Sequence, residues 1–272
     1  MKDILIYVRD FEERTPAAHF GVRLAAALGA AVTGVYASPR PIYVAPAFEP
    51  ELMATAIENA RELFKEAVQA KQSFLDWAAS HGAPQTDWLV VEGDAGDALA
   101  QAATRHDLLV LDHAGDDRAA AWDIPGLVLK TDIPCMVLPH SGVRYTPFER
   151  IAIGWNGSPE AMRAVHAALP FLQGKQALLM RGEERDKYPG LEWEPPFNIV
   201  DYLRRHGVAA EQRTIYAKYD DVGTALLDEA MKFRADLLVM GAYGRSRFSE
   251  WMLGGATRHV LTWSDIPVLM RH

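Results

Sequence analysis

Two copies of one sequence pattern lie in tandem in this chain of 272 residues, and no other feature restricts its fold as strongly. The run Asp107-Leu108-Leu109-Val110-Leu111 returns as Asp236-Leu237-Leu238-Val239-Met240. The triplet Asp132-Ile133-Pro134 returns as Asp265-Ile266-Pro267, each time ahead of a short apolar run. Self-similarity on this scale indicates two similar units. We therefore place one domain at 1–143 and a second at 148–272, around a linker that contains Gly, Ser and Pro.

Each half alternates short apolar runs with amphipathic segments. Ile4–Val8 and Ile151–Trp155 are typical of buried strands, and a helix-start signal follows each of them. Thr15-Pro16 and Ser158-Pro159 both supply a hydroxyl at the N-cap and proline at the first helical position. Strands separated by helices predict parallel pairing, right-handed crossovers and helices on both faces. The prediction is an α/β fold with two tandem, doubly wound, parallel five-stranded sheets.

Composition excludes several classes of partner. The net charge of −8 and the absence of a Lys/Arg run disfavour binding to nucleic acid or an anionic membrane. No apolar stretch approaches the roughly 20 residues that span a bilayer. The first apolar run is too short for a signal peptide and leads directly into Arg9 and Asp10. A single cysteine, Cys135, permits no intrachain disulfide, which is typical of a reducing compartment, and we expect a cytoplasmic protein.

A glycine-rich segment follows the fourth strand of the second half. Its glycines have the spacing Gly-x2-Gly-x9-Gly, and a helix is predicted to begin where the pattern ends. In open α/β sheets, ligands bind beyond the carboxyl ends of the strands. Glycines allow backbone N–H groups to approach phosphate oxygens, and a helix N-terminus adds partial positive charge. The binding residues predicted in this segment are Met240, Gly241, Gly244, Gly254, Gly255 and Ala256.

With these motifs, nearly the whole chain resembles the universal stress protein family in a tandem form. The resemblance implies the adenine-nucleotide α-hydrolase-like (Rossmann-like) fold, and it implies an ATP site in the second half, with Mg²⁺ accompanying the nucleotide. ATP-binding members have Ser or Thr after the last glycine of the motif, where this chain has Gly255. They also place an Asp after the first strand, in contact with the nucleoside, where this chain has Asn156. Both departures weaken the expected contacts.

The first half departs further from the family pattern. Asp112 stands at the position of Gly241, and four residues are missing before the next Asp-Ile-Pro. A carboxylate there would repel phosphate, so we expect the first half not to bind ATP in the family manner. The resemblance also implies that the final strands of the two halves, Met136–Leu138 and Val268–Met270, pair within the chain and make it a pseudo-dimer. Whether two chains also form a homodimer is left open.

These observations favour a nucleotide-responsive stress or regulatory binding protein over an enzyme. The chain has no P-loop, nucleophile elbow or zinc motif, so we assign no catalytic and no metal-ligating residue. One alternative is a protein-interaction scaffold with a degenerate nucleotide site, in which the stretch 181–196 serves as a recognition loop. Another is a weak ATPase, for which Asp220 and Asp221 are available, although both also fit helix capping.

Overall fold

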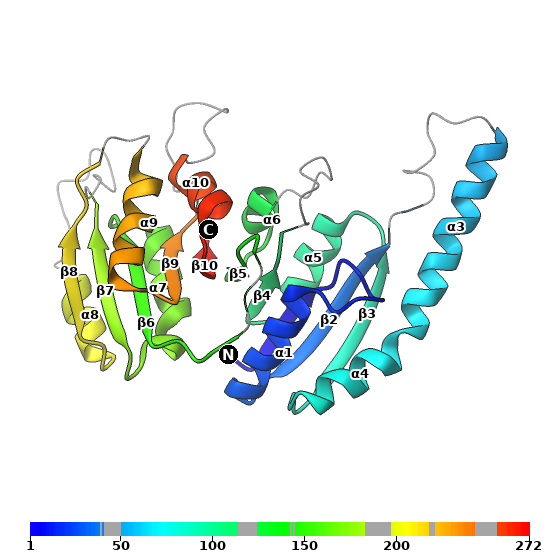
Figure 1. Cartoon of the computed structure of the whole chain (residues 1–272), viewed down its shortest axis with the longest axis horizontal. Helices are drawn as coiled ribbons and strands as arrows, with labels where there is room; N and C mark the ends of the chain where they lie inside the picture. The colour runs from blue at the N-terminus through cyan, green and yellow to red at the C-terminus, as the bar shows by residue number, and fades with distance from the viewer. Residues whose placement is uncertain are drawn as a thin grey trace. The chain divides into compact units, whose positions relative to one another are not determined.

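The computed structural model describes residues 1–38, 40, 50–113, 124–141, 143, 145–182, 197–217, 221–242 and 255–272, with 50–53 in backbone only. Contacts divide the chain into two compact units, Met1–Ile133 and Pro134–His272, which we call unit 1 and unit 2. In each unit, helices cover both faces of the strands (Figure 1). In the part of the chain that the structure describes, no helix is long and apolar enough to cross a membrane.

Unit 1 has four parallel strands in the order β3-β2-β1-β4. In Figure 1, α1 lies in front of these strands and α5 behind them. The strands are β1 (Asp3–Tyr7), β2 (Ala31–Ser38), β3 (Thr86–Glu92) and β4 (Leu108–Leu111). The helices are α1 (Pro16–Leu28), α3 (Pro50–Gln69), α4 (Lys71–Ser80), α5 (Ala95–Ala103) and α6 (Ile124–Lys130).

Unit 2 has the strand order β5-β10-β9-β6-β7-β8, in which only the β5–β10 pair is antiparallel. In Figure 1, α9 lies in front of its strands, and α7 and α8 lie behind them. The strands are β5 (Cys135–Val137), β6 (Arg150–Trp155), β7 (Gln176–Arg181), β8 (Ala210–Thr214), β9 (Leu237–Gly241) and β10 (Val268–Arg271). The helices are α7 (Pro159–Leu172), α8 (Ile199–Arg205), α9 (Val222–Phe233) and α10 (Gly255–Trp263).

The predicted doubly wound α/β class is confirmed, and so is the pairing of the two final strands. Met136 lies opposite Leu269 in the antiparallel ladder between β5 and β10. The sequence assigns β5 to the first half, whereas the division by contacts begins unit 2 at Pro134 and so places β5 in unit 2 with its partner β10. The domain limits at 143 and 148 stay a prediction.

The predicted helix starts are present with their capping bonds. The Thr15 hydroxyl accepts a hydrogen bond from the Ala18 amide of α1 at 3.3 Å. The Ser158 hydroxyl accepts one from the Ala161 amide of α7 at 3.1 Å. Gly29 ends α1 with φ of 59°, a left-handed conformation that glycine adopts without strain. The two central helices therefore begin at the carboxyl ends of β1 and β6.

The aspartate of the repeated Asp-Leu-Leu-Val motif has a structural role in both units. In unit 1, the Asp107 carboxylate accepts hydrogen bonds from the backbone amides of Lys2 at 2.6 Å and Asp3 at 3.3 Å. In unit 2, Asp236 accepts bonds from the amides of Glu149 at 2.7 Å and Arg150 at 3.1 Å. Each carboxylate thus fixes the amino end of the neighbouring central strand, and this accounts for the repeat of the aspartate.

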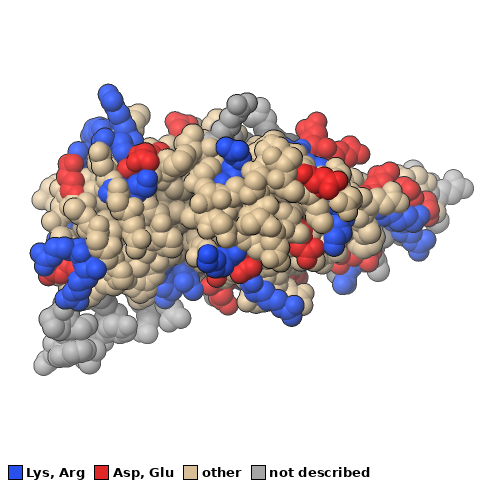
Figure 2. Space-filling model, turned by 90° about the horizontal axis from the view of Figure 1, so that it is seen from below, with Lys and Arg blue, Asp and Glu red and all other residues tan. Residues whose placement is uncertain are grey.

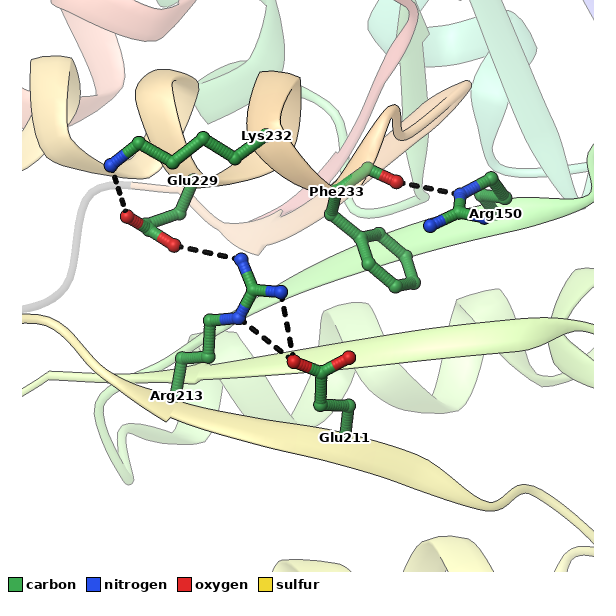
Figure 3. Close-up of polar contacts among 6 residues, drawn as sticks. All are labelled: Arg150, Glu211, Arg213, Glu229, Lys232 and Phe233. Atoms are coloured by element: carbon green, nitrogen blue, oxygen red, sulfur yellow. Dashed lines mark hydrogen bonds and ion pairs between the residues drawn. The ribbon is translucent and has the colours of Figure 1, made fainter.

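Polar contacts orient the C-terminal half of α9 over the sheet (Figure 3). Arg213 of β8 donates a hydrogen bond to Glu229 at 2.9 Å, and Lys232 donates one to the same carboxylate at 2.6 Å. These two donors lower the pKa of Glu229. Arg150 donates to the carbonyl oxygen of Phe233 at 2.6 Å and lies 4.5 Å from the centre of its ring. Such partly exposed ion pairs align the helix and add little stability.

We expect Asp107→Asn to lower the free energy of unfolding by about 1 kcal/mol at pH 7, because the charged acceptor is lost at an exposed site. The Lys2 amide, the largest influence, lowers the pKa of Asp107. The stability it contributes is therefore present above the unfolded pKa of about 3.9 and is lost as pH falls through the folded value. Urea denaturation at several pH values measures both effects.

The matched copy is Asp236→Asn, which we expect to cost a similar amount at pH 7. Asp228, an exposed aspartate of α9, provides the control, and Asp228→Asn should change the free energy of unfolding by less than about 0.5 kcal/mol. A loss for Asp107→Asn that grows as pH falls from about 5 to 3 would contradict the assignment.

Candidate functional site

Unit 2 has its topological switch point between β6 and β9. Strand β6 pairs with β7 on one side and β9 on the other, and Gly154 lies opposite Met240. Asn156 directly follows β6, and Gly241 is the last residue of β9. The structure therefore brings Asn156, Met240 and Gly241 to the same edge of the sheet. This is the edge at which open α/β sheets bind ligands.

The first turns of α9 and α10 pack against each other in unit 2. A Cβ atom built on Gly223 would lie 2.7 Å from the Cβ of His259 and 3.1 Å from the carbonyl oxygen of Ala256. His259 Nε2 lies 3.1 Å from the Thr224 hydroxyl. The sequence interpretation missed Gly223, although a glycine inside the first turn of a helix is a signal of close packing. The contact gathers two helix N-termini, each with partial positive charge, near Gly255 and Ala256.

Gly255 begins α10 and is exposed. A Cβ atom at this position would meet no atom of the described residues within 4 Å, so a side chain there displaces none of them. Because Gly255 has no side chain, it offers no side-chain acceptor to the first backbone amides of α10. Gly244 and Gly254 lie outside the described residues, and their predicted phosphate contacts stay predictions.

Gly241 has a packing reason that the sequence interpretation did not contain. A Cβ atom here would lie 2.5 Å from the amide nitrogen of Ala161 and 2.6 Å from the carbonyl carbon of Glu160. The first turn of α7 thus passes directly over the end of β9, and only glycine permits this approach. Contact of the Gly241 backbone with phosphate stays a prediction, but the glycine is needed for the fold in any case.

Asn156 is exposed and forms the turn into α7. Its side-chain oxygen accepts a hydrogen bond from the backbone amide of Ser158 at 3.1 Å. An aspartate could accept the same bond, so the turn geometry does not require the amide. The choice of Asn removes one negative charge from the switch point.

The equivalent place in unit 1 is filled by an ion pair. Arg9 follows β1 as Asn156 follows β6, and Asp112 follows β4 at the position of Gly241. Arg9 Nε donates to the Asp112 carboxylate at 2.8 Å, and the guanidinium also donates to the His113 carbonyl oxygen. The other carboxylate oxygen accepts a bond from the Ala17 amide of α1 at 2.8 Å. The side chain of Asp112 is only 2% exposed, and that of Arg9 is 24% exposed.

The contacts of Asp112 correct the expectation that its carboxylate repels phosphate, while the absence of ATP binding in the first half stays a prediction. The negative charge of Asp112 is compensated by Arg9 and by the first turn of α1, so simple repulsion of phosphate is not the main effect. Burial raises the pKa of the neighbouring Tyr7, and Tyr36 adds to the increase while Arg9 opposes it. The Tyr7 hydroxyl therefore stays protonated, and it adds no charge to this edge.

The structure describes Asp221 but not Asp220, the other residue considered for the ATPase alternative. Asp221 is exposed at the N-cap position of α9, but its side chain makes no capping hydrogen bond, so the predicted cap is wrong. Asp220 and the stretch 183–196 lie outside the described residues. Within the residues that are described, no group of three or more His, Cys, Asp or Glu side chains could hold a metal ion.

The strand order, the helix starts and the two switch points define a doubly wound α/β protein with a duplicated unit. The model of the Universal stress protein family matches residues 1–121 and 147–272, and the chain therefore belongs to this family. No curated protein sequence matches the chain.

Two solved structures illustrate the likeness. A universal stress protein from Archaeoglobus fulgidus DSM 4304 is 15% identical, with a TM-score of 0.66, and the match covers 99% of this chain and 95% of that one. A functionally unknown protein from Pseudomonas aeruginosa PAO1 is 12% identical, with a TM-score of 0.57, and the match covers 99% of this chain and 92% of that one. At these identities the likeness is one of fold.

We expect Asp112→Ala to lower the free energy of unfolding by about 3 kcal/mol or more, because it leaves Arg9 and the Ala17 amide without their shared acceptor. The control is Glu66→Ala, which removes an exposed carboxylate from α3 and should change stability by less than about 0.5 kcal/mol. Urea denaturation compares the two variants. A similarly small loss for both would show that the buried pair contributes nothing to unit 1.

Proposed function

We propose that this universal stress protein binds an adenine nucleotide at the carboxyl edge of unit 2, between β6 and β9, and acts as a nucleotide-responsive regulatory protein. The observation that supports this most is the start of α10. Gly255 is exposed, has no described residue within 4 Å of the position of a Cβ atom, and begins the helix that packs against the first turn of α9. Backbone amides at such a start can bind phosphate oxygens.

Electrostatics agrees with a small anionic ligand better than with a polyanion. The chain carries a net charge of −8. On the face seen in Figure 2, acidic and basic side chains are interspersed and form no continuous basic patch. Helix N-termini can supply local positive potential within such a surface. We propose that Mg²⁺ arrives with the triphosphate and is not held by protein carboxylates, and that the protein works in the cytoplasm.

A scaffold that recognises another protein is the second candidate. It is favoured by the two departures at the site, Asn156 and Gly255, which remove a charge and a hydroxyl that ATP-binding members use. Under this alternative the duplicated fold is retained and nucleotide affinity is absent. Direct measurement of affinity separates the two functions.

The sharpest test substitutes Gly255, because the space around it accepts a side chain. We expect Gly255→Asp to weaken ATP binding at least about tenfold, since a carboxylate there competes with phosphate for the first amides of α10. Gly255→Ser restores the hydroxyl of ATP-binding members and should strengthen binding. Calorimetric titration of ATP and AMP into each protein measures the affinities.

Aspartate is favourable at a helix start, so Gly255→Asp should keep or raise the melting temperature. A loss of binding without a loss of stability therefore identifies the site. Gly241 is unsuitable for this test, since any side chain there would collide with the first turn of α7. The absence of ATP and AMP binding by the unsubstituted chain would overturn the proposal and leave the scaffold function.

A further inference from the structure

We propose that Arg9 is an internal lock that closes the switch point of unit 1 to ligands. Its guanidinium bridges the residues that follow β1 and β4, and so occupies the place where a nucleoside would enter between the two strand ends. The chain then has one ligand site, in unit 2. This last consequence rests on the function proposed above, whereas the lock itself does not.

The contacts of Arg9 carry the proposal. Its guanidinium bonds two successive residues beyond β4, through the carboxylate of Asp112 and the carbonyl oxygen of His113. Strands β1 and β4 are paired neighbours, with Ile6 opposite Val110. The side chain therefore crosses from one strand end to the next over the switch point of unit 1. A guanidinium that donates to both a carboxylate and a carbonyl oxygen is held more firmly than a guanidinium in a single surface ion pair.

Asp112 holds the Arg9 guanidinium in place. Its carboxylate is shared between Arg9 and the Ala17 amide of α1, so it cannot move without breaking both bonds. The hydroxyl of Thr15 already caps the Ala18 amide of the same helix. Capping alone therefore does not explain why a buried carboxylate is placed at the end of β4. Its second partner, Arg9, does.

Unit 2 lacks both parts of the lock. Asn156 replaces Arg9 with a shorter side chain, whose oxygen accepts a hydrogen bond from the Ser158 amide of the adjacent turn. Gly241 replaces Asp112, and the first turn of α7 fills the space that its missing side chain leaves. The duplicated units thus differ at the two equivalent positions that flank the switch point. Among the described residues, Arg9 bridges the ends of β1 and β4 in unit 1, and Asn156 forms no such bridge in unit 2.

The test is hydrogen exchange by mass spectrometry on the full chain, with adenosine and ATP as the probes. Adenosine is uncharged, so Asp112 does not repel it. Arg9→Asn introduces the residue of unit 2, and Arg105→Asn, at an exposed arginine of the same unit, is the matched control. We expect Arg9→Asn to raise the exchange rate of segments 7–10 and 111–113 at least about tenfold. Adenosine should then slow exchange there.

In the unsubstituted chain and in Arg105→Asn, adenosine should leave both segments unchanged. Protection of 7–10 or 111–113 by adenosine in the unsubstituted chain would overturn the lock. So would an Arg9→Asn protein in which these segments keep their original exchange, or in which adenosine does not protect them. In the same experiment, slower hydrogen exchange of segment 255–259 in the presence of ATP indicates binding at the proposed site of unit 2. Its absence would remove the proposed function and leave the result on Arg9 intact.

Discussion

The structure depends on one constraint in each unit, which is the parallel pairing of a central strand with neighbours on both sides. Strand β1 pairs with β2 and β4, and β6 pairs with β7 and β9. The chain leaves the central strand in one direction and later returns to its other side, so the loops at its carboxyl end diverge. Asp107 and Asp236 strengthen this arrangement because each ties the start of the neighbouring strand, β4 or β9, to amides at the start of the central strand. The candidate site is a consequence of this topology.

The two units differ in how the helix after the central strand packs on the end of the neighbouring strand. In both, a helix capped by Thr or Ser begins just beyond the central strand, and its first turn approaches the end of the next strand. In unit 1, the Asp112 carboxylate fills the space between the first turn of α1 and the end of β4, and Arg9 is its counter-ion. In unit 2, Gly241 has no side chain, so the backbone of the first turn of α7 packs directly on the end of β9. The two units thus share one topology and differ in their contacts at these two equivalent positions.

The candidate site could be predicted from the sequence only in part. The alternation of strands and helices predicted that Gly241 ends a strand and that Gly255 begins a helix, and the structure has both, while their role in binding stays a prediction. The packing role of Gly241 and the contact at Gly223 could not be predicted, because both depend on the distance between helices far apart in sequence. The Arg9–Asp112 pair was missed for the same reason. Its members are separated by 103 residues, and no local pattern connects them.

The sequence by itself determined the duplication, the α/β class, and the helix starts at Thr15 and Ser158. These features are local or periodic, and hydrophobic patterning and capping chemistry specify them without knowledge of the packing. Only the tertiary structure decided that β5 counts with unit 2, that Gly241 is required by α7, and that Arg9 and Asp112 form an ion pair across the ends of β1 and β4. Each of these depends on which atoms meet within a few ångströms across the fold. Burial and charge compensation depend on these contacts between residues that are distant in the sequence, and not on the individual residues.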